Sequence, residues 1–298
     1  GLLLELALHL ALGSARLLFE LQLQFLLRLP GLLVREPPRI GFRHACRTFF
    51  VAHLSEAKRA RAALQNATSP GETATYVLNG FPPGAAPLYL ALGARPVIGS
   101  LEEAREWAAH GAAPPCTLHV DTGMNRLGLA MRDLDDPSVA QAIAALDIDL
   151  VMTHLVASEA PVDPVNARQI QAFRELMRRF PGKRHSLLNS SGHFLKEAPR
   201  GGLTRPGYAL YGGNPTPGRA NPMKPVVGLE ASIISVREVG AGDRAGYNGS
   251  WIATGRRRLA TISLGYADGM PRNAGGIVER AGGYALVGGA RCPFVGTV

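Results

Sequence analysis

The sequence predicts an α/β fold, a (β/α)8 TIM-type barrel followed by a partial C-terminal all-β domain. Three observations support this prediction. From about Arg47, short apolar runs alternate with helix-like stretches. Seven such units fit into about 170 residues, which favours a barrel over an open sheet. Beyond a Pro-rich segment, the helical periodicity disappears and Gly-rich turns separate strand-like runs.

The first 34 residues are unusually rich in leucine. Titratable side chains interrupt them every few positions, at Glu5, His9, Arg16, Glu20 and Arg28. A membrane span needs about 20 mostly uncharged residues, and a signal peptide needs a basic start and a small-residue cleavage site. The stretch matches neither pattern. We therefore expect an amphipathic helix or a segment foreign to the fold, and assign residues 1–44 to an atypical leader.

The apolar runs after this leader are suited to buried parallel strands. They lie at Thr48–Val51, Thr75–Leu78, Pro96–Ile98, Thr117–Val120, Leu150–Thr153, Ser186–Leu188 and Tyr208–Tyr211. Ser55 and Ser100 are placed as helix N-caps, and Glu103 gives Ser100 a capping-box spacing. A helix over residues 166–180 has its apolar side chains on one face. The eighth strand of a barrel has to come from the stretch before Arg47.

The segment Asn214–Pro225 fits a linker between two domains. The barrel is therefore assigned to residues 45–225 and the all-β domain to residues 226–298. Strands of the second domain are expected at Leu229–Val239, Arg258–Leu264 and Ala285–Val287. The sequence ends at Val298 in what is expected to be another strand, so we expect this domain to be truncated.

Composition fits a globular protein of the reducing cytoplasm, with 46% hydrophobic residues. Cys46, Cys116 and Cys292 are far apart and odd in number, which disfavours a disulfide framework and a zinc site, so no metal is expected. The net charge of +9 is scattered, and only Arg256–Arg258 forms a tight basic run. Its place between two strand-like segments favours a solvated hairpin. We expect neither a nucleic-acid nor a membrane partner.

Polar residues gather where predicted barrel strands end, which is where barrels carry their functional groups. The segment HVDTGMNRLGL at residues 119–129 places Asp121, Asn125 and Arg126 after one strand. Later strands end in MTH at residues 152–154 and NSSG at residues 189–192, and the seventh is entered through TRPGY at residues 204–208.

The late strands also predict an anion pocket. The Ser190 hydroxyl and the backbone N–H groups around Gly207 and Tyr208 would form it, with Arg205 nearby. Barrels often bind phosphate at this place.

Eight segments, in order, resemble the alanine racemase family, from about Cys46 to Val298. They are CRTFFVAHLSEA, HVDTGMNRLGL, MTHL, LNSSG, RPGYALYGG, AGYNGSW, ISLGYADGMPR and CPFVGTV. Each segment alone is weakly specific, but the shared order and spacing make the resemblance strong. It implies a pyridoxal 5'-phosphate (PLP) enzyme, an isomerase that interconverts L- and D-alanine.

The resemblance implies a set of cofactor-binding residues. Ser190, Gly207 and Tyr208 are similar to the family's phosphate-binding positions, and Asn189 precedes Ser190 as it does in the family. Arg205 is similar to the arginine at the pyridine nitrogen of PLP. Because an arginine is always charged, it would keep that nitrogen unprotonated and limit side reactions.

The resemblance also implies catalytic residues. His154 matches the histidine that pairs with the ring-nitrogen arginine, and Arg126 matches the arginine near the substrate carboxylate. Tyr247 matches the tyrosine base at one face of the α-carbon, and Tyr266 matches a tyrosine at the substrate entrance. Racemisation needs acid/base groups on both faces. A tyrosine with a pKa of about 10 would need nearby cations to lower it. In the family this tyrosine comes from a second subunit, which implies a homodimer.

The sequence departs from the family pattern in three places. Family members carry the cofactor lysine in a KADAYG-like first strand, whereas this sequence has no lysine before Lys58, which should point outward from a helix. His119 stands where many relatives have a modified, anionic lysine. Family residues beyond the position of Val298 are absent. We expect that Gly1 to about Phe42 is not the native family N-terminus; a KADAYG-like strand in another reading frame would support this.

The function implied by the resemblance is supply of D-alanine for cell-wall peptidoglycan. Two alternatives remain open. One is a related barrel PLP enzyme, either a racemase for a broader set of amino acids or a decarboxylase. The other is a catalytically dead PLP-binding barrel, which the missing lysine would explain.

Overall fold

The computed structural model describes residues 2–5, 32–34, 47–65, 73–111, 113–226, 228–277 and 280–296. These residues fall into two compact units, and each is described by itself. The barrel unit holds residues 47–226, and the β unit holds residues 2–5, 32–34 and 228–296. Across these described ranges, no helix combines the length and apolar character needed to cross a bilayer.

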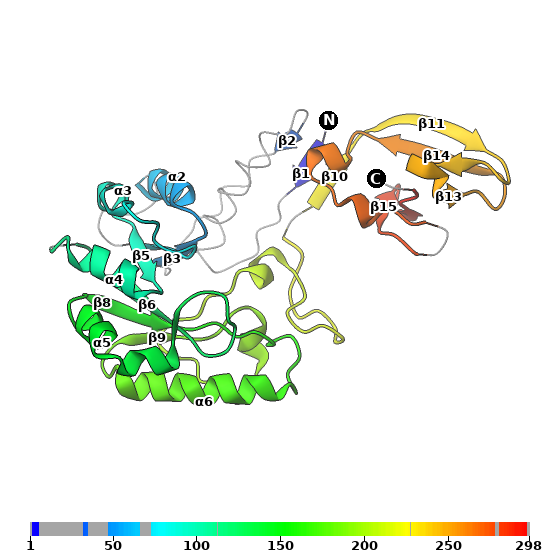
Figure 1. Cartoon of the computed structure of the whole chain (residues 1–298). Helices are drawn as coiled ribbons and strands as arrows, with labels where there is room; N and C mark the ends of the chain where they lie inside the picture. The colour runs from blue at the N-terminus through cyan, green and yellow to red at the C-terminus, as the bar shows by residue number, and fades with distance from the viewer. Residues whose placement is uncertain are drawn as a thin grey trace. The chain divides into compact units, whose positions relative to one another are not determined.

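Parallel strands and helices alternate along the barrel unit (Figure 1). The strands are β3 (Thr48–Val51), β4 (Ala74–Val77), β5 (Arg95–Ile98), β6 (Cys116–Asp121), β7 (Leu129–Ala130), β8 (Ile148–Met152) and β9 (Arg184–Ser186). The helices are α2 (Leu54–Gln65), α3 (Ala86–Leu92), α4 (Leu101–Ala108), α5 (Pro137–Ala144) and α6 (Pro164–Arg179). Three 3₁₀ turns complete the unit: η1 (Met131–Asp135), η2 (Ser191–Phe194) and η3 (Tyr208–Tyr211).

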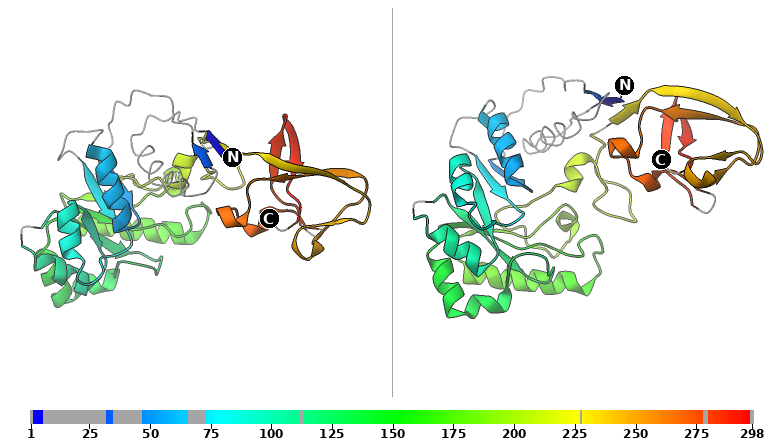
Figure 2. Two further views of the ribbon diagram at one scale, coloured as in Figure 1. Left: turned by 90° about the horizontal axis from the view of Figure 1, so that it is seen from above. Right: turned by 45° about the horizontal axis from the view of Figure 1, so that its top comes forward.

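The sheet follows the chain in the order β3-β4-β5-β6-β8-β9, with every pair parallel and the short β7 paired to β6. Because the strands are parallel, their carboxyl ends lie on one rim of the sheet, where the polar segments were predicted. Figures 1 and 2 show the helices along the outer side of this curved sheet, with α6 beside β8 and β9. The first five predicted strands are confirmed to within one or two residues at each end.

The last two predicted barrel strands need correction. The strand expected at Ser186–Leu188 lies two residues earlier, as β9. The strand expected at Tyr208–Tyr211 is wrong, because these residues form the turn η3. Pro206 cannot donate a ladder hydrogen bond, and the Ala209 N–H is taken by the Ser190 hydroxyl. An apolar run this short does not distinguish a strand from a buried turn.

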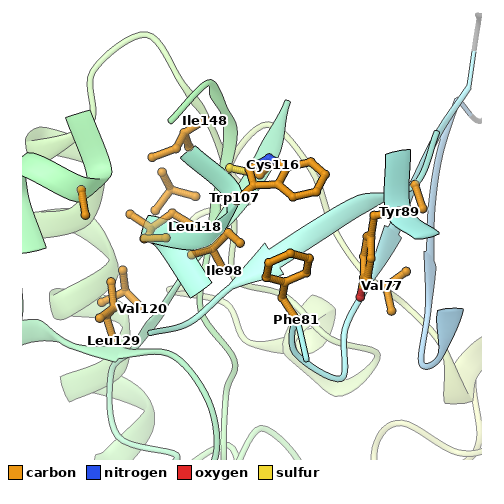
Figure 3. Packing of buried hydrophobic residues seen from close by; sticks show 14 of the residues in the cluster. Val77, Phe81, Tyr89, Ile98, Trp107, Cys116, Leu118, Val120, Leu129 and Ile148 are labelled. Carbon is orange, nitrogen blue, oxygen red and sulfur yellow. The ribbon is translucent and has the colours of Figure 1, made fainter. Parts of the chain in front are cut away.

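The main hydrophobic core lies between the sheet and its helices (Figure 3). Val77, Ile98 and Leu118 point to it from neighbouring strands. On the helix side, the rings of Phe81, Tyr89 and Trp107 meet edge to face, with centroids 5.2 to 6.1 Å apart. Such ring pairs contribute about 1 kcal/mol each beyond the area they bury. These contacts hold α3 and α4 on the sheet.

Helix starts follow local capping chemistry, with one correction. Ser100 caps α4 as predicted, since its hydroxyl accepts the Glu103 N–H at 3.2 Å. The Glu103 carboxylate accepts instead from the N–H groups of Gly99 and Phe81 and so ties the ends of two strands together. Ser55 is not an N-cap, because α2 already begins at Leu54. Helix α6 begins and ends close to its predicted limits.

A charged cluster fills the sheet at the opposite rim, where the strands begin. Asp149, the second residue of β8, accepts from Arg184 at 3.0 Å and also pairs with Arg95 and the Tyr76 hydroxyl. Burial and the Asp149 hydrogen bond raise the pKa of Tyr76 to about 12. One carboxylate therefore joins three strands, β4, β5 and β9, to β8.

From β10 (Gly228–Ala231) onward, the strands of the β unit form antiparallel pairs. The strands after β10 are β11 (Ile233–Val239), β12 (Arg244–Ala245), β13 (Trp251–Ile252), β14 (Arg257–Ile262), β15 (Tyr284–Val287) and β16 (Ala290–Pro293). The 3₁₀ turns of this unit are η4 (Tyr247–Gly249), η5 (Tyr266–Asp268) and η6 (Arg272–Ala274). The three predicted strand regions are confirmed, and β11 pairs antiparallel with β14 (Figure 2). The basic run is exposed as expected, but it does not lie on a hairpin turn, because Arg257 and Arg258 begin β14 and residues 240–256, with β12 and β13, separate β14 from β11. In that run, the exposed Arg256 pairs with Glu238 at 2.6 Å.

Two short pieces of the leader are described, and both are strands of the β unit. These are β1 (Leu2–Glu5) and β2 (Leu32–Val34). β1 pairs with β10 and with β2. The amphipathic-helix prediction is therefore wrong for these residues, while the rest of the leader and the expected eighth barrel strand lie outside the described residues. Between η3 and β10, the described residues contain neither helix nor strand, as the linker prediction requires.

Replacing Asp149 tests the charged cluster. We expect Asp149→Asn to lower the free energy of unfolding by about 2 kcal/mol, because two partly buried guanidiniums lose their counter-charge. Urea denaturation at neutral pH measures the change. Asp135 is a matched control, since it pairs with Arg179 at 2.7 Å but is mostly exposed; Asp135→Asn should change stability by about 0.5 kcal/mol at most. Equal losses in the two variants would contradict the assignment.

Candidate active site

Arg205 lies between η2 and η3 and connects the ends of two strands. Its guanidinium donates to the Ser186 hydroxyl on β9 and to the carbonyl oxygen of Thr153, just after β8. The same group lies 3.5 Å from Nδ1 of His154. Its carbon atom is 5.9 Å from the centroid of the Phe50 ring on β3. Arg205 thus reaches three strands of the sheet.

All of these partners are neutral. Within the described part of the chain, Arg205 forms no ion pair with a carboxylate. Burial lowers the pKa of Arg205 to about 10, so the group still carries its charge at neutral pH. A desolvated cation without a counter-charge is costly, and it favours an anionic or electron-rich ligand beside it.

Two histidines near this cation are neutral. Burial, followed by the charge of Arg205, lowers the pKa of His154 to about 4. The same two causes lower the pKa of His119 to about 4, although the Asp121 carboxylate opposes the shift. His119 is 6% exposed and lies on β6. At neutral pH, neither histidine adds positive charge or supplies an anion.

Ser190 joins the two turns that follow β9. Its hydroxyl oxygen accepts the N–H of Gly207 at 3.0 Å and that of Ala209 at 3.1 Å. These bonds leave the hydroxyl proton for another acceptor. A Cβ on Gly207 would meet no atom within 4 Å, so there is open space in front of this backbone. The predicted neighbours Ser190, Gly207 and Arg205 therefore do lie together.

The other predicted cofactor residues have different surroundings. The Asn189 amide oxygen accepts from Ser158 and from the Gly192 N–H, both at 2.9 Å, so this side chain holds the turn η2. The Tyr208 ring is exposed and covers Gly213, where a Cβ would lie 2.3 Å from the ring. The Tyr208 side chain thus packs on the chain at Gly213.

The loop that carries Arg126 is fixed by one carboxylate. Asp121 accepts the N–H groups of Gly123, Met124 and Asn125 at 2.7 to 2.9 Å. Gly128 has a φ of 105°, and a Cβ there would lie 2.9 Å from the Asp121 nitrogen, so only glycine fits.

Beyond this loop, Arg126 and His119 line a cavity of about 240 Å³ at the carboxyl-end rim. Arg126 is close enough to His154 for its charge to lower the pKa of that histidine. In the described part of the chain, no hydrogen bond joins the side chains of Arg126 and His154.

Tyr247 and Tyr266 belong to the β unit. Their ring centroids lie 6.4 Å apart, and the guanidinium of Arg272 lies 5.3 Å from the Tyr266 ring centroid. The hydrogen bond with Tyr266 raises the pKa of Tyr247, and Arg272 lowers it by less. A tyrosine base needs a nearby cation to lower its pKa. Within the β unit, Arg272 is therefore not enough to lower the pKa of Tyr247.

The four lysines of the sequence, Lys58, Lys183, Lys196 and Lys224, are all exposed. Lys58 points outward from α2, as predicted. No group of three or more His, Cys, Asp or Glu residues at described positions could hold a metal ion.

Sequence reasoning missed four polar residues around Arg205 and His154. Ser186 and Thr153 accept hydrogen bonds from Arg205. Thr122 and Gln169 form a buried hydrogen-bonded chain with Thr153 and the His154 backbone. The available signal was a glutamine on the apolar face of α6, one position before Ile170.

Comparison with known proteins gives the same family along most of the chain. Residues 41–215 match the alanine racemase N-terminal domain, and residues 226–298 match the alanine racemase C-terminal domain. The alanine racemase of Methylobacterium nodulans is 56% identical over 257 residues, covering 85% of this chain and 66% of the relative. A catabolic alanine racemase of Agrobacterium fabrum is 40% identical over 262 residues, covering 86% of this chain and 65% of the relative.

A solved structure agrees in fold. The alanine racemase from Bartonella henselae with covalently bound pyridoxal phosphate superposes with a TM-score of 0.70 at 32% identity, covering 85% of this chain and 69% of that chain. The likeness confirms the predicted barrel with a C-terminal all-β domain. The chain spans about two thirds of the length of these relatives. On the family matches and the identity to its relatives, this chain belongs to the alanine racemase family.

Proposed function

We propose that this chain binds PLP and that the protein to which it belongs interconverts L- and D-alanine. The observation that carries the proposal is the Arg205 guanidinium, a desolvated cation held among neutral acceptors with open space at Gly207 nearby. The name of the Methylobacterium nodulans relative and the bound pyridoxal phosphate of the Bartonella henselae structure support it.

The residues present fit PLP in charge and in hydrogen bonding. Arg205 would face the pyridine nitrogen, and the hydroxyl proton of Ser190 with the backbone at Gly207 and Tyr208 would bind the phosphate. Asn189 would act by holding this turn in place. Neutral His154 would keep Arg205 oriented without adding a second charge.

Bound PLP supplies an electron sink that stabilises negative charge at the substrate α-carbon. Arg126 would bind the alanine carboxylate, since a guanidinium matches a carboxylate in charge and geometry. Tyr247 would move the proton at one face of the α-carbon, and Tyr266 would line the entrance. Because the pKa of Tyr247 is raised within its own unit, we propose that a second copy of the chain supplies the cationic surroundings, in a homodimer with shared sites.

We further propose that the protein acts in the cytoplasm to supply D-alanine for peptidoglycan. The Agrobacterium fabrum relative is named as catabolic, so use of alanine as a nutrient is the competing role. No nucleic-acid or membrane partner is proposed, because the tight basic run lies at the start of β14 and Arg256 is paired with Glu238. We retain a leader over residues 1–44, a barrel over 45–225 and a β domain over 226–298; the family matches at 41–215 and 226–298 support these limits.

A lysine that binds PLP covalently distinguishes an active enzyme from a catalytically dead PLP-binding barrel, and this sequence lacks one at the family position. Borohydride treatment after addition of PLP tests for covalent attachment at a lysine. We expect none in this chain, because its four lysines are exposed and none of them lies before Lys58, where a KADAYG-like first strand would be. Adding a lysine-bearing first strand should restore attachment and alanine racemisation. Release of CO2 would favour a decarboxylase, and turnover of serine or lysine a broader racemase.

Two ligands that differ only in the phosphate test the proposed cradle. We expect Ser190→Ala to weaken PLP about tenfold and pyridoxal little, since the hydroxyl proton of Ser190 would bind the phosphate, which pyridoxal lacks. Arg205→Gln should weaken both ligands about tenfold or more. Equilibrium titration followed by absorbance gives the dissociation constants. A Ser190 variant that keeps the preference for PLP over pyridoxal would contradict the assignment.

Acid should destabilise the barrel unit through His119. Its folded pKa of about 4 lies below the unfolded value of 6.5, so the unfolded state binds the proton first as pH falls. The contribution of His119 to the free energy of unfolding is therefore complete above pH 6.5. It is lost as the pH falls towards 4, by about 3 kcal/mol at most. His119→Gln removes the titrating ring and should lose less. Urea denaturation at pH 7 and pH 4.5 measures both; identical losses would refute the role of His119.

Removing the proposed base tests the β unit. In a chain with a lysine-bearing first strand, Tyr247→Phe should lower kcat for alanine racemisation about 10² to 10⁴-fold, because the phenol can no longer carry a proton. Tyr284→Phe is the control, since this tyrosine lies on β15 and accepts from Arg291 at 2.7 Å. Its rate should stay within about twofold. Unchanged turnover in Tyr247→Phe would exclude this residue as the base.

A further inference from the structure

Gln169 is a fully buried amide on α6 that contacts two strand ends of the candidate site. Its Nε2 donates to the Thr122 hydroxyl at 3.1 Å and to the His154 carbonyl oxygen at 2.8 Å. Its Oε1 accepts the Val156 N–H at 3.0 Å. Both donors and the acceptor of the amide are therefore used.

Each partner of this amide leads to a residue of the site. Thr122 lies between Asp121 and Gly123, in the loop that carries Arg126. Its hydroxyl is 2.7 Å from that of Thr153, whose carbonyl oxygen accepts from Arg205.

On the other side of Gln169, the held carbonyl belongs to His154, whose ring lies against Arg205. Gln169 thus lies between the Arg126 loop and the pair formed by His154 and Arg205.

The chemistry of this position requires a primary amide. A carboxylate of the same length has no donor for the two oxygens. An apolar side chain would remove the hydrogen bonds that Gln169 makes to the His154 carbonyl oxygen and the Val156 N–H. It would also leave the Thr122 hydroxyl with Thr153 alone. A lysine could donate but could not accept from Val156. A helix side chain that meets two loops in this way fixes the distance between them, since α6 is itself packed through Ile170, Phe173 and Leu176.

We infer that Gln169 is a positioning residue, which holds the Arg126 loop and the His154 strand end in register so that Arg126, His154 and Arg205 meet one ligand. Gln169 touches neither substrate nor cofactor in this inference, which rests on the proposed function. Its effect passes through Thr122 on one side and the His154 backbone on the other.

Asn166 provides a matched control on the same helix. It is 3% exposed, and its Nδ2 donates to the carbonyl oxygens of Ala157 and Ala160, at 3.1 and 2.9 Å. It therefore holds the same β8–α6 loop with the same kind of group, one turn before Gln169, but contacts neither Thr122 nor His154. A purely structural effect should be similar in Asn166→Leu and Gln169→Leu.

The experiment compares these two variants of the full chain. PLP and pyridoxal dissociation constants are measured by titration, and the pKa of His154 is measured by NMR, with its signal assigned through His154→Gln. We expect Gln169→Leu to weaken both ligands about tenfold, the equivalent of one lost hydrogen bond in the site. We also expect it to raise the pKa of His154, because a displaced ring is less buried and lies farther from Arg205, Arg126 and His119. Asn166→Leu should change neither quantity.

A milder variant guards against loss of folding. Thr122→Val keeps the shape of the side chain and removes only its hydroxyl, and it should weaken the ligands about threefold. The double variant Gln169→Leu/Thr122→Val should be no weaker than Gln169→Leu alone, because both changes cut the same connection.

The outcomes separate this inference from the proposed function. If the unmodified chain binds neither PLP nor pyridoxal, the proposed function fails, and the pKa of His154 in the two leucine variants still tests Gln169. An equal His154 pKa and equal ligand affinities in Gln169→Leu and Asn166→Leu would overturn the inference.

Discussion

The site depends on one uncompensated charge, the Arg205 guanidinium. Three neutral oxygen or nitrogen acceptors hold it, and they come from two different strand ends. A carboxylate in their place would neutralise the charge and remove the reason for an anion to bind. Neutral acceptors instead fix the direction of the guanidinium and leave its field available. The low pKa values of His119 and His154 follow first from burial and then from this charge.

The carboxylates of the barrel unit are used elsewhere, which keeps this field intact. Asp121 is committed to three backbone N–H groups of its own loop, and Glu103 to the N–H groups of Gly99 and Phe81. Asp149 lies with Arg95 and Arg184 at the rim where the strands begin. The parallel sheet thus separates its two ends: paired charges stabilise one rim, while the other keeps an unpaired cation.

Much of this arrangement was predictable, because parallel strands and family motifs leave strong local signals. Buried apolar runs gave the strand order, and the spacing of Ser190, Arg205 and Gly207 placed them together. Two kinds of feature were not predictable. Tyr208–Tyr211 is apolar enough for a strand, but a tertiary hydrogen bond from the Ala209 N–H to Ser190 and local backbone bonds within residues 207–212 hold it as a turn. Gln169 lies on an apolar helix face, and nothing in its sequence neighbourhood indicates that Thr122, 47 positions away, is its partner.

The residues proposed for binding and the residue proposed for proton transfer belong to different units of the chain. The residues proposed to hold PLP, Ser190, Arg205 and Gly207 among them, belong to the barrel unit, and the hydrogen bonds of Ser190 and Arg205 lie within it. The proposed proton carrier, Tyr247, belongs to the β unit, where its hydrogen bond to Tyr266 makes it a weaker acid. If these residues act as proposed, the barrel unit can bind its ligand independently of the base. Proton transfer then requires a second, independent condition, namely cationic surroundings that bring the tyrosine pKa down towards the working pH.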